Sequence, residues 1–92
     1  MPIYLVEAFL PRGHAGSHRG HELAADAAAA ESTRDGTPVR VVGSIYVPDD
    51  ETCLISVEAP SAAVVHTIVR RAGLRVLRVV EAVVTDRLVR SS

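Results

Sequence analysis

The order in which strand-like and helix-like segments follow one another constrains this chain more than any other feature. Four short segments are rich in β-branched and aromatic residues. Three of the four are followed within two residues by proline, which favours a turn. This pattern predicts strands over residues 3–9, 39–47, 52–59 and about 75–84.

Two further segments have helical character. An Ala-rich run predicts one helix over residues 17–34, with Ser17 as its N-cap. A second helix over residues 61–72 begins at Ser61 and ends before Gly73, because glycine readily adopts the positive φ that ends many helices. The apolar residues of this second helix recur at helical spacing and form one stripe: Val65, Ile68, Val69 and Ala72.

The resulting order, βαββαβ, favours an α+β fold. We expect a ferredoxin-like sandwich, in which a four-stranded antiparallel sheet carries two helices on one face. With strands numbered in chain order, the expected spatial order is 4-1-3-2, with the first and third strands as parallel neighbours at the centre. Residues 1–84 then form a single domain, and residues 85–92 form a loosely ordered C-terminal tail.

Composition and charge exclude several classes of protein. All ten basic residues are Arg and eleven residues are acidic, so a net charge of −1 gives no electrostatic footprint for nucleic acid. No apolar run approaches the roughly 20 residues that span a bilayer. The chain has one cysteine, Cys53, and no signal-like segment at its start, so we expect a cytoplasmic protein without an intramolecular disulfide.

One face of the predicted sheet is too apolar to remain in water. Regular alternation divides the side chains of each strand between a helix-covered face and an uncovered face. The uncovered face is expected to carry Ile3, Leu5, Phe9, Val42, Tyr46, Leu54, Leu77 and Val79. Exposed patches of this kind mark interaction sites. We therefore predict a homodimer with an interface that includes Leu5, Phe9, Val42, Tyr46, Leu54, Val79 and Glu81.

Three carboxylates, Glu7, Glu58 and Glu81, fall among these apolar residues. If the first and third strands are parallel neighbours, Glu7 and Glu58 lie close together near the carboxyl ends of those strands. Like charges on a buried face need protons, arginine partners or a cation. Arg40 and Arg78 are the available arginine partners, and a metal ion is the functional alternative.

The stretch RGHAGSHRGHE carries three of the four histidines of the chain. It leaves the first strand at the end where the carboxylates are expected, which would bring imidazoles and carboxylates together. Mixed sets of these groups suit nickel, zinc, cobalt or iron rather than copper(I). The sequence thus predicts a site for nickel or another divalent transition metal, with ligands drawn from His14, His18, His21, Glu7 and Glu58.

Structural interpretations stand beside these functional ones. The histidine stretch also fits a His- and Gly-rich loop without metal, and Gly16 and Gly20 argue against one continuous helix through it. His66 lies on the flank of the second helix and fits a half-exposed surface residue. Cys53 is assigned to the core as an inert thiol.

Three stretches carry a family resemblance: MPIYLVEAFLP, GTPVRVVGSIYVPDDETCLISVEAPSAAVV and RRAGLRVLRVVEAV. With them the chain resembles the small actinobacterial ferredoxin-like domains of unknown function typified by a nickel-binding protein. The resemblance implies the βαββαβ fold, a homodimer, and nickel at or near the subunit interface, with Glu7, Glu58 and Glu81 as matching positions. The chain departs from the family at Arg75, where proline is usual, and in the histidine stretch.

Three functions fit these observations. The first is a metal-binding homodimer with no assigned catalytic activity. The second is a dimerisation or interaction module without metal, which explains every residue except the clustering of the histidines. The third is a cofactor-independent monooxygenase-like enzyme of the dimeric α+β type, with Tyr46 and His66 beside an apolar pocket. The scarcity of polar groups that would position a substrate argues against an enzyme.

Overall fold

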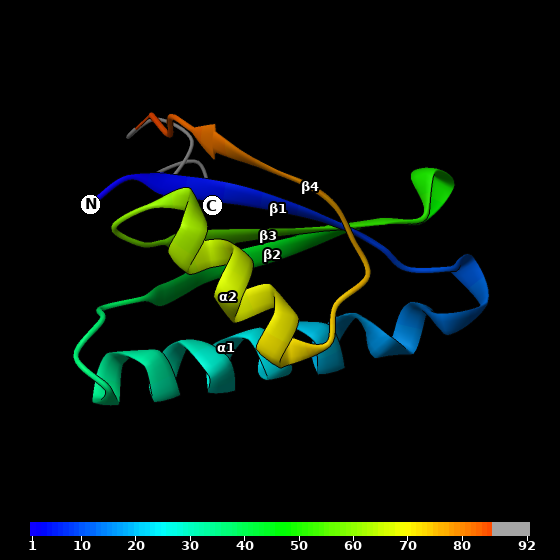
Figure 1. Ribbon diagram of the computed structural model, residues 1–92. Coiled ribbons are helices and arrows are strands. Elements are labelled where there is room, and N and C mark those ends of the chain that lie inside the picture. The colour runs from blue at the N-terminus through cyan, green and yellow to red at the C-terminus, as the bar shows by residue number, and fades with distance from the viewer. Residues whose placement is uncertain (86–92) are drawn as a thin grey trace.

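The computed structural model describes residues 1–85, without the side chains of residues 14 and 15, and its elements follow the predicted order. Figure 1 shows a sheet with both long helices on the same face. The strands are β1 (Ile3–Phe9), β2 (Arg40–Val47), β3 (Thr52–Glu58) and β4 (Val76–Ala82), and the helices are α1 (His18–Arg34), α2 (Ala62–Ala72) and the short 3₁₀ helices η1 (Arg12–Ser17) and η2 (Pro48–Asp50). The tail predicted over residues 85–92 lies outside the described residues, except for residue 85. Within residues 1–85, no helix combines the length and the apolar character needed to cross a bilayer.

The sheet has the strand order β2-β3-β1-β4, which confirms the predicted ferredoxin-like α+β arrangement. Every pair of neighbouring strands is antiparallel. The expectation that β1 and β3 are parallel is therefore wrong. The crossover through α1 returns β2 to the direction of β1, and the tight turn at η2 then reverses the chain, so β3 runs against β1.

A β-bulge interrupts each of the two edge strands. In β2 the register with β3 shifts between Val41 and Gly43, which leaves Val42 as an extra residue. In β4 an equivalent shift against β1 leaves Leu77 as the extra residue. Because side chains alternate with a period of two, one extra residue reverses the face on which the rest of the strand places its side chains. Regular alternation therefore predicts the faces of β1 and β3 correctly and fails in parts of β2 and β4.

The bulges contradict three predicted interface positions. Tyr46 lies opposite Cys53, and Val79 lies opposite Val6, so both are on the helix-covered side and pack against the core. Glu81 also falls on that side and is exposed. Their places on the uncovered face are taken by Ile45, Val47 and Val80.

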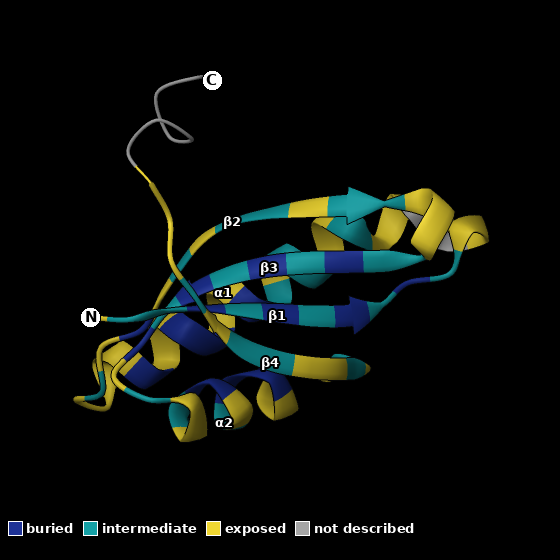
Figure 2. Cartoon of the chain, turned by 90° about the horizontal axis from the view of Figure 1, so that it is seen from above, coloured by how far each residue is buried: buried dark blue, intermediate teal, exposed yellow. Residues whose placement is uncertain are grey.

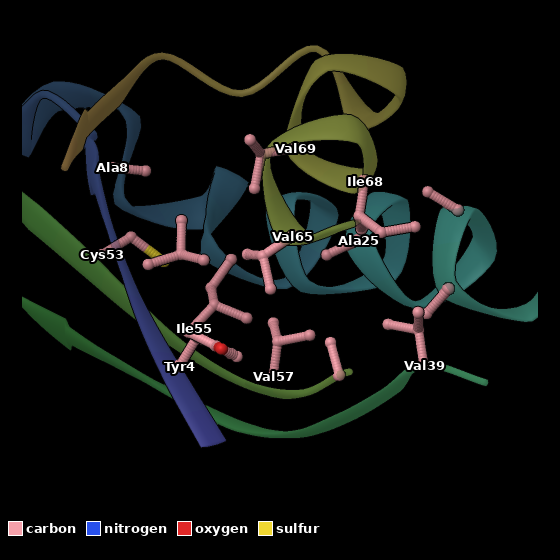
Figure 3. Packing of buried hydrophobic residues seen from close by; sticks show 14 of the residues in the cluster. Tyr4, Ala8, Ala25, Val39, Cys53, Ile55, Val57, Val65, Ile68 and Val69 are labelled. Atoms are coloured by element: carbon pink, nitrogen blue, oxygen red, sulfur yellow. The ribbon is translucent and has the colours of Figure 1, made fainter. Parts of the chain in front are cut away.

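The core lies between the sheet and the two helices. Figure 3 shows side chains of β3 and α2, such as Ile55 and Val65, meeting between these layers. The four buried residues of α1 are all small: Ala25, Ala28, Ala29 and Ser32. Cys53 is 0 % exposed, so its predicted place in the core is confirmed.

The ends of α2 are set as the sequence predicts. The Ser61 hydroxyl accepts a hydrogen bond from the Val64 N–H at 3.4 Å, and Gly73 follows the helix with a φ of 72°. The start of α1 differs from the prediction, because the Ser17 side chain makes no capping hydrogen bond. Since η1 runs directly into α1, Ser17 already has helical backbone angles.

Candidate functional site

The structure separates the two carboxylates that were expected to share a metal ion. Glu7 lies opposite Leu54 on β3, whereas Glu58 lies opposite Ile3 on β1. These positions are four residues apart along β1, which corresponds to about 13 Å at about 3.3 Å per residue. Glu7 and Glu58 are therefore too far apart to be ligands of one ion within a single chain.

Each of these carboxylates is paired with an arginine directly across the sheet. Glu7 forms an ion pair with the Nε of Arg78, and the Oε1 of Glu58 lies 3.4 Å from the Nε of Arg40. The two carboxylate side chains are only 22 % and 27 % exposed. Partly buried carboxylates of this kind need a counter-charge. The arginine partners named from the sequence are therefore confirmed.

The histidine stretch forms η1 and the first turn of α1. His14 lies in η1, and the structure does not describe its side chain. His18 and His21 lie in α1, and Gly20 does not interrupt this helix. The Nδ1 of His21 lies 3.0 Å from the carbonyl oxygen of Ser17, which satisfies part of its hydrogen-bonding capacity within the helix.

The predicted metal ligands whose side chains are described lie on two sides of the sheet. His18 contacts β2 on the helix-covered side, whereas Glu7 projects from the other side of the sheet. In the described part of the chain, no three His, Cys, Asp or Glu side chains form a group that would hold a metal ion. Among the predicted ligands with described side chains, His18 and His21 lie in the same element, α1.

The imidazole of His18 and the carboxylate of Glu22 meet at the hydroxyl of Ser44. The Nε2 of His18 lies 2.8 Å from Ser44 Oγ, and this hydroxyl donates to the Oε2 of Glu22 at 2.7 Å. His18 and Glu22 are one helical turn apart on α1, so they share a face of the helix. The bulge at Val42 places Ser44 opposite that face. We call this contact the hydroxyl bridge. Regular alternation along the strand would put Ser44 on the same face as Val42 and Tyr46, so the sequence pattern does not predict the hydroxyl bridge.

The direction of these hydrogen bonds decides what the hydroxyl bridge can do. The proton of Ser44 points to Glu22, so the Nε2 of His18 carries the hydrogen that Ser44 accepts. A serine nucleophile needs the reverse order, in which an imidazole accepts the serine proton. The hydroxyl bridge therefore links α1 to β2 and lacks the arrangement of a hydrolytic site.

Tyr46 extends the same link, and it lies far from its expected partner His66. The hydroxyl of Tyr46 donates to the carbonyl oxygen of Leu10 at 3.0 Å, and its ring centroid lies 5.9 Å from that of His18. His66 is exposed on α2 and lines a groove with β4, which is at the opposite edge of the sheet from β2. Tyr46 and His66 therefore do not line one pocket in the described part of the chain.

Cys53 lies directly across from Tyr46, beneath the hydroxyl bridge. Burial and, to a smaller extent, the carboxylate of Glu22 raise the pKa of the Cys53 thiol above its ordinary value. A thiol that resists ionisation is a poor nucleophile and a poor metal ligand. This cysteine therefore fits the inert role that the sequence predicts.

The helix-free side of the sheet, hereafter the open face, carries an apolar surface between the two arginine–glutamate pairs. Its apolar residues are Ile3, Leu5, Phe9, Ile45, Val47, Leu54 and Val80. Figure 2 shows this side, where open-face positions of β1 and β3 alternate with buried ones. Leu5, Phe9 and Leu54 lie on the open face as predicted, and Val42 is 46 % exposed at the bulge. Ile45, at 63 % exposed, joins them because of that bulge.

Comparisons with models of protein families, with curated proteins and with solved structures find no match to this chain. The resemblance to the small ferredoxin-like domains therefore stays a prediction, and function has to be inferred from the geometry of the chain itself.

Proposed function

We propose that the protein is a homodimerisation module in which two copies bury their open faces against each other. The observation that carries this proposal is an apolar face that no helix covers and on which both acids are paired with arginines. The helices cover only the other side of the sheet.

The charges on the open face support a second copy of the chain as the occupant. On this face Glu7 is neutralised by Arg78, and Glu58 is neutralised by Arg40. An unpaired carboxylate would be costly to bury. Arg75, a further charge beside this face, is exposed, and its guanidinium lies 5.7 Å from the centroid of the Phe9 ring. Paired as they are, these groups remain compensated when a second open face covers them.

The size of the open face sets the expected strength of the dimer. Four strands about 4.8 Å apart and about seven residues of about 3.3 Å each give a projected area of about 440 Å². A standard interface buries about 800 Å² of accessible surface on each partner. Protruding side chains make the accessible surface larger than the projected area. Two copies therefore approach the standard interface size only when they bury the whole open face. We therefore expect a dimer of moderate affinity that dissociates on dilution.

Substitution of Leu54 tests the proposal. Leu54 lies on a central strand between Glu7 and Ile45, and Glu7 already pairs with Arg78, so Leu54→Arg adds an excess positive charge in the middle of the open face. We expect wild type to elute with the mass of a dimer at about 100 μM in size-exclusion chromatography with light scattering, and the variant to elute as a folded monomer.

A matched control uses an exposed leucine on another face. Leu23 on α1 is 53 % exposed, so Leu23→Arg introduces the same charge outside the open face. This variant should remain dimeric. A wild-type monomer at this concentration, or a dimer that both substitutions leave intact, would refute the proposal.

A further inference from the structure

A groove runs between α2 and the edge strand β4. Its volume is about 600 Å³, and it is lined by His66, Val69, Arg70, Leu74, Val76, Leu77 and Arg78. The proposed dimer shares only Arg78 with the lining of this groove, because α2 lies on the helix-covered side of the sheet. The groove therefore needs an explanation of its own.

The strand that forms one wall of the groove has an unpaired edge. β4 is the last strand of the sheet and pairs only with β1 among the described residues. Alternate N–H and C=O groups of such a strand point away from the sheet and are free to pair with another strand. An extended peptide that adds to a strand edge beside a helix obtains main-chain hydrogen bonds from the strand and side-chain contacts from the helix.

The lining of the groove specifies the chemistry of the peptide. Its apolar part consists of Val69, Leu74, Val76 and Leu77, and its polar part consists of His66, Arg70 and Arg78, with no acidic residue. Arg78 also forms an ion pair with Glu7, whereas Arg70 forms no ion pair within residues 1–85. Side chains of an added strand alternate between the two sides of the sheet, so an occupant in which every second residue is acidic can direct its acids to His66 and Arg70. Its apolar side chains then extend the open face beside Val80.

A second copy of β4 matches the groove less well. In antiparallel self-pairing, opposite residues share a face, and Arg78 shares its face with Val80 and Ala82 but not with Glu81. Arg78 would therefore lie opposite an apolar residue or another Arg78. Self-pairing at this edge would also bring two cationic grooves side by side.

We propose that the groove between α2 and β4 binds an extended acidic peptide, which adds to the sheet as a strand beside β4. The probe is a synthetic peptide, acetyl-VEVDVE-amide, added to the full-length ¹⁵N-labelled protein. We expect amide shifts concentrated in α2 and β4, and we expect the basic peptide acetyl-VKVKVK-amide to bind at least about tenfold more weakly because of the groove charge. The acidic peptide N-methylated at alternate residues should lose binding, because it cannot form the main-chain hydrogen bonds.

Two charge-reversal variants locate the contact. Arg70→Glu should weaken the acidic peptide by at least about tenfold, because it removes the unpaired cation of the groove. Arg19→Glu makes the same change on an exposed position of α1 and should alter binding less than about twofold. Absent shifts at millimolar peptide, shifts spread over the whole protein, or equal effects of the two variants would overturn the proposal. Concentration-dependent broadening of β4 amides without peptide would show that β4 self-pairs, which would also overturn it.

Discussion

At the scale of single residues, the Ser44 hydroxyl is the point where the polar contacts of α1 and β2 meet. The change Ser44→Ala leaves the imidazole of His18 and the carboxylate of Glu22 without their shared partner. A hydrogen bond contributes about 0.5–1.5 kcal/mol net, and water replaces part of it at a half-buried site. We expect the variant to lose about 1–2 kcal/mol of unfolding free energy in urea denaturation.

Ser17→Ala is the matched control for this measurement. The Ser17 hydroxyl precedes the same helix but makes no capping hydrogen bond, so its removal should change the unfolding free energy by less than about 0.5 kcal/mol. If the two alanine variants were equally stable, the hydroxyl bridge would contribute nothing measurable to the link between α1 and β2.

At the scale of elements, the bulges separate what the sequence reveals from what it hides. The central strands β1 and β3 alternate regularly, so the faces of Leu5 and Leu54 follow directly from the pattern. The edge strands contain extra residues at Val42 and Leu77. In the sequence, Val42 looks like any other apolar strand residue, because a bulge depends on how two strands pair and not on local composition. Because both depend on this bulge, the sequence pattern predicts neither the side of the sheet on which Tyr46 lies nor the hydroxyl bridge.

The bulge in β2 makes a single-residue deletion informative. Without Val42, the pairs Val41–Val57 and Gly43–Ser56 become consecutive, so both halves of β2 keep their faces. Deletion of Val42 should therefore leave a folded protein with cooperative thermal unfolding. Deletion of Ile45, a regular position, shifts the rest of the strand and moves Tyr46 to the opposite face. This second deletion should cost several kcal/mol and unfold a marginally stable domain.

Circular dichroism and melting temperature compare the two deletions directly. The expected order is wild type first, the Val42 deletion slightly below, and the Ile45 deletion largely unfolded. If both deletions were equally disruptive, the extra residue would be necessary for pairing rather than accommodated by it.

At the scale of the whole molecule, the topology is readable from the sequence, whereas the convergence of side chains is not. Hydrophobic periodicity and turn residues are local signals, so the element order and strand order follow from them. Whether Glu7 lies near Glu58 depends on the relative direction of β1 and β3. Parallel strands would place the two acids close together, but β1 and β3 are antiparallel. The antiparallel direction separates the two acids, and the registers of β1 with β4 and of β2 with β3 place each of them beside an arginine. This pairing of the acids with arginines is the feature on which the proposed dimer rests.

If two copies share the open face, folding and association are linked, and the melting temperature must rise with protein concentration. Where the dimer predominates, a tenfold higher protein concentration raises the free energy of unfolding by about 1.4 kcal/mol per dimer, or about 0.7 kcal/mol per chain. Since about 1 kcal/mol shifts Tm by about 4–8 °C in a domain of this size, each tenfold step should raise Tm by about 3–6 °C. Scanning calorimetry over two decades of concentration measures this slope. Leu54→Arg should melt at one temperature throughout, and a wild-type Tm equally independent of concentration would contradict a dimer formed by folded chains.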